Sequence, residues 1–139
     1  MNRTLTVASA ILLVAVVAGC GIFGRSSGAE DRFVRPDVPR DSPSGRYVAS
    51  LVPGPDQDGI STQVVVIHDA QGTEVFRDDY AYSGRHGVGV VWRSDRDQLW
   101  ILSSDVGTAY VQQQDSTWVK TAITPETRGD IPGEIAELR

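Results

Sequence analysis

Short runs of β-type residues, at near-regular spacing, fill the sequence between residues 45 and 123. Each run is rich in Val, Ile, Thr, Tyr or Trp, and turn-forming Gly, Asp and Ser residues separate the runs. No window in this region has the 3.6-residue period of an amphipathic helix. The pattern predicts an all-β domain, a single antiparallel meander of about seven strands. The expected strands cover residues 46–52, 63–68, 73–80, 87–93, 98–103, 108–113 and 117–123.

The apolar residues within two of these runs predict which side chains form the core. Because side chains alternate along a strand, residues 46–52 would place Tyr47, Ala49 and Leu51 on one face. Residues 64–67 are consecutive branched aliphatic residues, which is typical of a strand that is buried on both faces. The two runs together predict a strand pair at the centre of the domain.

The first 20 residues have the layout of a secretory signal. Arg3 supplies a positive charge, an uncharged apolar stretch runs from Leu5 to Ala18, and small residues precede Cys20. As a helix this stretch would span about 21 Å, which is short of the roughly 30 Å hydrocarbon core of a bilayer. We therefore expect a signal peptide over residues 1–19. Two alternatives remain: an ordinary secretory signal, in which Cys20 has no special role, and a short anchor that is not cleaved.

The four residues Val17-Ala18-Gly19-Cys20 resemble the lipobox of bacterial lipoproteins. The resemblance implies that Cys20 carries a diacylglyceryl thioether and that a signal peptidase cuts between Gly19 and Cys20. Several acyl chains of the palmitate type would hold the protein on a membrane durably, whereas a single chain binds only marginally. The expected location is the cell membrane, with the protein lipid-anchored on the extracytoplasmic side.

Composition divides the rest of the chain into a tether and a domain. Residues 20–44 are rich in Pro, Gly, Ser and Asp with only scattered apolar residues, which predicts a lipidated flexible tether. The β domain would then occupy residues 45–139. After Pro125 we expect a short helical or irregular tail with Asp130 as a helix cap. One stripe of this tail would carry Ile131, Ile135 and Leu138.

The charge and the cysteine content exclude several kinds of partner and cofactor. The net charge of −5 opposes binding to nucleic acid, because such binding depends on Lys and Arg neutralising phosphates. Cys20 is the chain's one cysteine, so its lipidation leaves no thiol for a disulfide or a redox centre. His68 and His86 are too few for a zinc site without cysteine. We expect no metal and no cofactor.

Two segments resemble the blade repeats of β-propellers. Residues 42–49 read Ser-Pro-Ser-Gly-Arg-Tyr-Val-Ala, similar to the S-P-D-G-R-x-hydrophobic-A opening found in the periplasmic propeller of the Tol system and in the prolyl oligopeptidase family. Residues 91–101 look like a second copy, and residues 66–72 resemble the strand and turn that follow in a blade. About 80 strand-rich residues make at most two blades, and a closed propeller needs at least four. The resemblance therefore implies a small sandwich or barrel, or two propeller-like blades, in a family of undetermined function.

Residues 77–87 are the candidate binding segment. Tyr and Arg side chains provide large contacts at low entropic cost, and Gly residues flank this segment. The alternative is a solvated hairpin whose Tyr side chains pack on the sheet. The candidate binding residues are Asp78, Asp79, Tyr80, Tyr82, Arg85 and His86.

The sequence favours a binding protein over an enzyme. Asp79, Ser83 and His86 include the residue types of a catalytic triad, but positions this close on one hairpin rarely orient a base. We expect a non-catalytic module that binds a protein partner or a cell-wall component at the envelope. The alternatives are an inhibitor or immunity lipoprotein that blocks a hydrolase, and a structural subunit whose open sheet edges pair with another chain.

Overall fold

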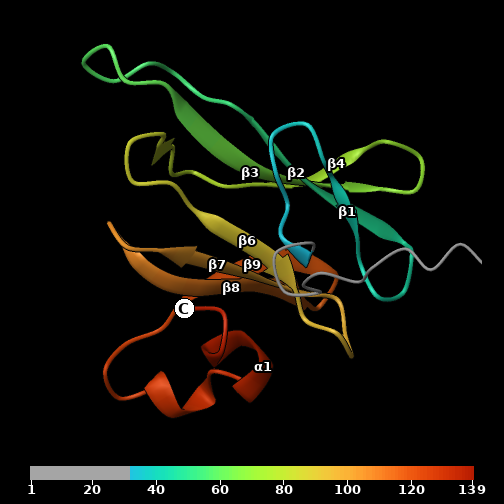
Figure 1. Ribbon diagram of the computed structural model, residues 1–139. Coiled ribbons are helices and arrows are strands. Elements are labelled where there is room, and N and C mark those ends of the chain that lie inside the picture. Colours follow the sequence, from blue (N-terminus) through green and yellow to red (C-terminus); the bar gives the residue numbers. More distant parts are fainter. Residues whose placement is uncertain (1–31) are drawn as a thin grey trace, which may run out of the picture.

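Two antiparallel β-sheets stack face to face, and a short C-terminal segment covers the outer face of one of them (Figure 1). The computed structural model describes residues 32–139. The predicted signal peptide, Cys20 and the first part of the predicted tether lie outside this range. The all-β class expected from the sequence is confirmed, with nine short strands.

The first sheet contains the strand order β1-β2-β3-β4, and β5 pairs with β3. Ala49 lies opposite Ile67 and Leu51 opposite Val65, so these four side chains share one face of the sheet. The sequence missed β1 and β5, which are two residues long and carry no alternation. The bounds are β1 Arg40–Asp41, β2 Tyr47–Pro53, β3 Thr62–Asp69, β4 Glu74–Arg77 and β5 Tyr82–Ser83.

The second sheet is a meander in the order β6-β7-β8-β9. All seven expected strands are present, and they divide into two stacked sheets, which is the small sandwich among the arrangements expected from the sequence. The chain crosses from the first sheet to the second between Ser83 and Gly89, and alternation along a strand does not show where such a crossing occurs. The bounds are β6 Gly89–Trp92, β7 Gln98–Ser103, β8 Gly107–Gln114 and β9 Thr117–Ala122.

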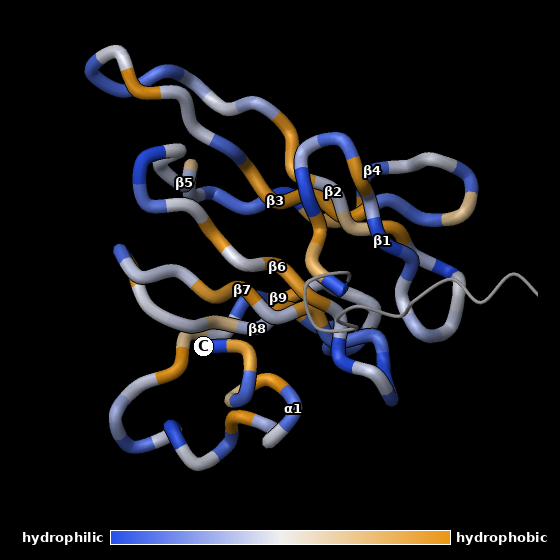
Figure 2. Tube along the Cα trace, viewed as in Figure 1, coloured by the Kyte–Doolittle hydropathy of each residue, from blue (hydrophilic) through white to orange (hydrophobic). Residues whose placement is uncertain are grey.

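The main core lies between the two sheets. Ala49 and Leu51 are buried, and so is every residue of 64–67, as the sequence predicted. In Figure 2 the hydrophobic segments lie along the strands, and the loops at both ends of the sandwich are mainly hydrophilic. The core cluster contains Val34, Ala49, Leu51, Val65, Ile67, Tyr82, Val90, Trp92, Leu99, Ile101, Val111 and Trp118.

The C-terminal segment forms a third layer on the outer face of the second sheet. It contains the 3-10 helix η2 (Arg128–Asp130) and the short helix α1 (Gly133–Ala136). The predicted role of Asp130 as a helix cap is wrong, because α1 begins at Gly133 and Pro132 takes the cap position. No helix within residues 32–139 is long and apolar enough to cross a membrane. The apolar cluster between this layer, the second sheet and the N-terminal segment contains Phe33, Val91, Trp100, Leu102, Tyr110, Ile123, Ile131, Ile135 and Leu138.

Residues 32–44 belong to the folded domain. The Val34 amide donates to the Val90 carbonyl at 2.8 Å, Phe33 forms a bridge with Val91, and β1 pairs with β2. The prediction of a tether that extends to Ser44 is therefore wrong for these residues. Short extended segments rich in Pro are compatible with a sheet edge, where a missing amide donor is not needed. Composition alone did not reveal this pairing.

The chain enters the domain at one end of the sandwich, which we call the entry end. Arg32 donates to the carbonyl of Trp92 at 3.1 Å, beside the β6–β7 turn. The β1–β2 turn lies there too, because Ser44 Oγ donates to Asp97 at 2.6 Å. The opposite end, the far end, carries the β2–β3 hairpin tip, the β5–β6 loop and the β7–β8 turn (Figure 1). The hairpin tip is a tight turn in which Asp58 and Gly59 have positive φ angles of 51° and 75°.

Candidate binding site

The predicted binding segment, residues 77–87, divides into a buried half and an exposed half. Asp78 and Tyr82 are 4% and 2% exposed, and the Tyr82 hydroxyl donates to Asp78 Oδ2 at 2.7 Å. Asp79, Arg85 and His86 are exposed. Asp78 and Tyr82 therefore cannot contact a partner directly, which corrects their assignment as binding residues.

A lysine from the other sheet completes the buried half. Lys120 on β9 lies 2.7 Å from Asp78 Oδ1 and 2.9 Å from Oδ2, and it donates to the Tyr82 hydroxyl at 3.0 Å. Burial raises the pKa of Tyr82 far above its usual value, and the hydrogen bond to Asp78 adds to this, so the hydroxyl stays protonated. The three side chains link the first sheet to the second and have a structural role.

The exposed half is held in a defined shape by its neighbours. The Gly84 amide donates to the Ser61 carbonyl at 2.8 Å, and a side chain at position 84 would approach that oxygen to 2.9 Å. The loop therefore needs Gly at this position. Tyr80 is half-buried, and its hydroxyl donates to Asp105 at 3.3 Å. Arg85 and His86 remain as the outward side chains at the tip.

A cleft of about 400 Å³ opens beside this loop at the far end. Its apolar surface comes from three parts of the chain, the N-terminal segment, β7 and the C-terminal segment, through Phe33, Leu102 and Leu138. His86 and Arg139 lie at its polar side. The structure thus brings one predicted binding residue, His86, to a concave surface.

A second concavity, the entry-end groove, was not predicted from the sequence. It measures about 600 Å³ and lies between the β3–β4 turn and the β8–β9 turn. Tyr47 of the first sheet and Trp118 of the second contact each other across it, with ring centroids 4.9 Å apart in a T-shaped arrangement. Its residues come from several strands, so no local pattern could have indicated it. The groove is lined by Arg46, Tyr47, Asp69, Ala70, Gln71, Val75, Gln113, Ser116, Thr117 and Trp118.

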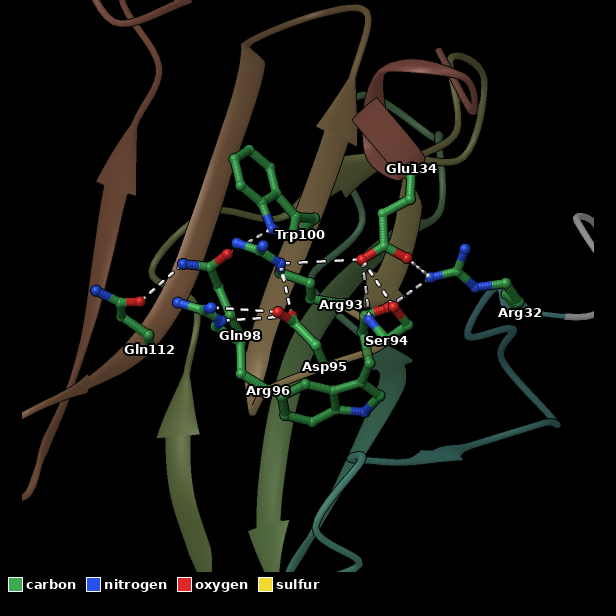
Figure 3. Close-up of polar contacts among 10 residues, drawn as sticks. Arg32, Arg93, Ser94, Asp95, Arg96, Gln98, Trp100, Gln112 and Glu134 are labelled. Atoms are coloured by element: carbon green, nitrogen blue, oxygen red, sulfur yellow. Dashed lines mark hydrogen bonds and ion pairs between the residues drawn. The ribbon is translucent and has the colours of Figure 1, made fainter. Parts of the chain in front are cut away.

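A polar cluster around Glu134 joins α1 to the rest of the domain (Figure 3). One carboxylate oxygen accepts from Arg32 at 2.8 Å, and the other accepts from the amide and hydroxyl of Ser94 at 3.1 and 3.0 Å. Burial alone would raise the pKa of Glu134, but the hydrogen bonds from Ser94 and Arg32 outweigh it, so the pKa lies below its usual value. Every polar atom of this carboxylate is used in holding the layers together.

A second part of Figure 3 shows hydrogen bonds within the second sheet. Gln98 accepts from the indole of Trp100 at 2.9 Å and donates to Gln112 at 2.7 Å. These partners satisfy a buried indole donor, so this cluster is also structural. Within residues 32–139, no three side chains of His, Cys, Asp or Glu are grouped so that they could hold a metal ion.

No protein-family model, no curated protein and no solved structure matches this chain. The sandwich, the far-end cleft and the entry-end groove are therefore interpreted from their own geometry.

Proposed function

We propose that the protein is a lipid-anchored, non-catalytic binding module of the bacterial cell envelope. The observation that carries this proposal is the position of the chain entry relative to the exposed loop. Arg32 joins the domain at the entry end, and Arg85 and His86 lie at the far end. An acylated Cys20 would be at most about 40 Å of extended chain away from Arg32. The anchor would therefore keep the entry end near the bilayer and leave the far end open to the envelope.

The chemistry of the far end suits recognition of another molecule. Arg85, His86 and Asp79 provide charged and polar groups on a loop with a fixed shape. The adjacent cleft offers the apolar side chains of Phe33 and Leu102. Apolar anchors surrounded by exposed polar groups are the usual composition of a binding surface. A protein partner or a cell-wall component fits this surface.

Removal of the lipid-accepting residue tests the anchor. In the Cys20→Ala variant, we expect the precursor to keep its full length, to take no acyl label and to lose stable membrane attachment. A Ser27→Ala variant serves as the control. Normal cleavage and unchanged membrane retention in Cys20→Ala would disprove the lipid anchor.

Site-specific cross-linking in cells tests the orientation and the binding role. A photo-reactive residue at position 85 or 86 should capture an envelope component, and the same residue at the exposed position Glu126 should not. Equal cross-linking from all three positions, or no cross-linking from positions 85 and 86, would show that the loop is not part of the binding surface.

A structural subunit of an envelope assembly is the second candidate, and the free edge of β9 favours it. Strand β9 pairs with β8, and no strand within residues 32–139 pairs with its other edge. Lys120, its one charged side chain, points inward to Asp78. Exposed strand edges can pair with another chain, and a lysine that is already paired with a buried carboxylate does not oppose this. The amide of Ala122 faces the free edge, so a stable oligomer in light scattering that Ala122→Pro abolishes would support the assembly role.

A further inference from the structure

We propose that the entry-end groove is a binding site for a neutral glycan chain. This inference rests on the proposed function, because it specifies which kind of cell-wall component the module takes. It concerns a surface at the opposite end from Arg85 and His86, so the two sites can be tested separately.

The floor of the groove is aromatic and apolar. Tyr47 and Val75 come from strands β2 and β4 of the first sheet and Trp118 comes from β9 of the second, and all three line the groove. Sugar rings present apolar C–H groups on their faces and hydroxyls around their edges. A floor of this kind suits the ring faces, because ligand sites are mainly apolar with a few polar groups that fix orientation.

The walls of the groove supply hydrogen-bonding groups that carry no charge. Gln71 comes from the β3–β4 turn, and Gln113, Ser116 and Thr117 come from the β8–β9 hairpin. Each of these side chains both donates and accepts hydrogen bonds, as sugar hydroxyls do. The side-chain amides of Gln71 and Gln113 are exposed and have no hydrogen-bond partner within the described part of the chain. They are free to bind a ligand.

The charged groups at the groove are already paired, which favours a neutral ligand. Arg46 lies 3.4 Å from Asp97 and covers the ring of Tyr47 at 5.5 Å. Asp69 accepts from the amides of Gln71 and Thr73, each at 2.9 Å, and so closes its own turn. Because Arg46 already has a carboxylate partner, it attracts an anionic ligand less than an unpaired cation would. A neutral ligand does not depend on such attraction, and this exposed side chain can move aside from the Tyr47 ring.

Two costly features of the domain meet at this groove. The indole nitrogen of Trp118 is buried, and no acceptor for it exists within residues 32–139. In the β8–β9 turn, Asp115 and Ser116 have positive φ angles of 47° and 70°, where Gly is preferred. A buried donor without a partner requires an explanation, and strained backbone clusters at functional sites. Their coincidence supports a ligand-binding role for the groove.

Saturation-transfer NMR tests the proposal on the full chain reconstituted in phosphatidylcholine vesicles. The probes are β-1,4-linked tetrasaccharides of glucose and of N-acetylglucosamine, with a sulphated tetrasaccharide as the charged comparison. We expect at least one neutral probe to receive saturation and the sulphated probe to receive less. No transfer to either neutral probe, or stronger transfer to the sulphated one, would overturn the proposal.

Two neighbouring glutamines provide the matched variants. Gln113 lines the groove, whereas Gln114 is equally exposed on the same strand but does not line it. Gln113→Ala should weaken glycan binding by about five- to tenfold, which corresponds to one lost hydrogen bond, and Gln114→Ala should leave it unchanged. Equal affinities for the two variants would place the glycan elsewhere. The glycan-binding measurement does not depend on Cys20 or on cross-linking at position 85. A negative result would therefore not contradict the lipid anchor or the far-end binding surface.

Discussion

Lys120 shows how one residue can join the two layers of this domain. It is the single lysine of the chain, and its amine reaches a carboxylate whose side chain is completely buried. Burying a charge pair gives little net stability, because the desolvation of both groups offsets their attraction. Leaving one member without its partner is costly. The pair therefore fixes how the sheets face each other more than it adds to the free energy of unfolding.

Removing the amine should destabilise the domain strongly. Lys120→Met leaves the Asp78 carboxylate buried and unpaired, and we expect a loss of about 3 kcal/mol in the free energy of unfolding, measured by urea denaturation. In the double variant Asp78→Asn with Lys120→Met no charge stays buried, so part of the loss should be recovered. Arg85→Ala, at an exposed position, should stay within about 0.5 kcal/mol of the parent. A Lys120→Met variant as stable as Arg85→Ala would show that the pair is solvated.

The β8–β9 turn offers a stabilising substitution at a single residue. Ser116 has a φ angle of 70°, a conformation that costs L-residues about 1 kcal/mol or more and that Gly adopts freely. Ser116→Gly should therefore raise the free energy of unfolding by about 0.5–1 kcal/mol in urea denaturation. Ser104→Gly is the control, since Ser104 has no positive φ angle and the change should be slightly destabilising. If both variants lose stability equally, the turn does not carry this strain.

At the scale of elements, the C-terminal segment depends on its contacts for its structure. Helix α1 has four residues, far fewer than an isolated helix needs in water. Ile135 is completely buried against the second sheet, and Glu134 bonds to Arg32 and Ser94. The segment is therefore held by its apolar side chains, of which Ile135 is completely buried, and by the carboxylate of Glu134.

The acid sensitivity of the domain should depend on Glu134. Its pKa in the folded state lies below the unfolded value near 4.5, so its stabilisation is present above that pH and is lost as the pH falls through the folded pKa. Glu134→Gln should therefore lower stability at neutral pH and make the loss of stability below about pH 4.5 shallower than in the parent. Thermal midpoints measured from pH 7 down to pH 3 check this. Parallel curves for the two proteins would mean that Glu134 does not contribute.

At the scale of the whole molecule, the layers should open in a definite order. Strands β3 and β7 have paired neighbours on both sides, and the core between the sheets contains most of the buried residues. The C-terminal layer rests on a smaller apolar cluster. Regions with fewer buried contacts open at lower free energy. We expect amide hydrogen exchange to be slowest in β3 and β7 and much faster in residues 123–139. Equal protection of the two regions would show that the domain opens as one unit.

The sequence predicted local structure well because strands and turns depend on neighbouring residues. The alternation through Tyr47 and Leu51 and the continuous aliphatic run at 64–67 identified the two strands that cross the centre of the first sheet. The stripe of Ile131, Ile135 and Leu138 identified the face of the tail that packs on the second sheet. Each of these patterns lies within a few residues, so the printed sequence shows it directly.

The candidate site was predicted only in part, because burial depends on residues far away in the chain. Arg85 and His86 are exposed as a binding role requires, but Tyr82, which the sequence also indicated as a binding residue, is a side chain of the core. No local signal distinguishes Tyr82 from Tyr80. Their difference comes from Lys120, which lies 38 residues further along the chain from Tyr82.

The sequence by itself determined the β class and the strand positions, because both depend on adjacent residues. The tertiary structure alone decided which strands belong to each sheet, that residues 32–44 join them, and that Tyr47 and Trp118 meet across a groove. Residues 47 and 118 are brought together only when the two sheets pack face to face. Packing of this kind depends on the combined shape and burial of many side chains, and no short stretch of sequence contains that information.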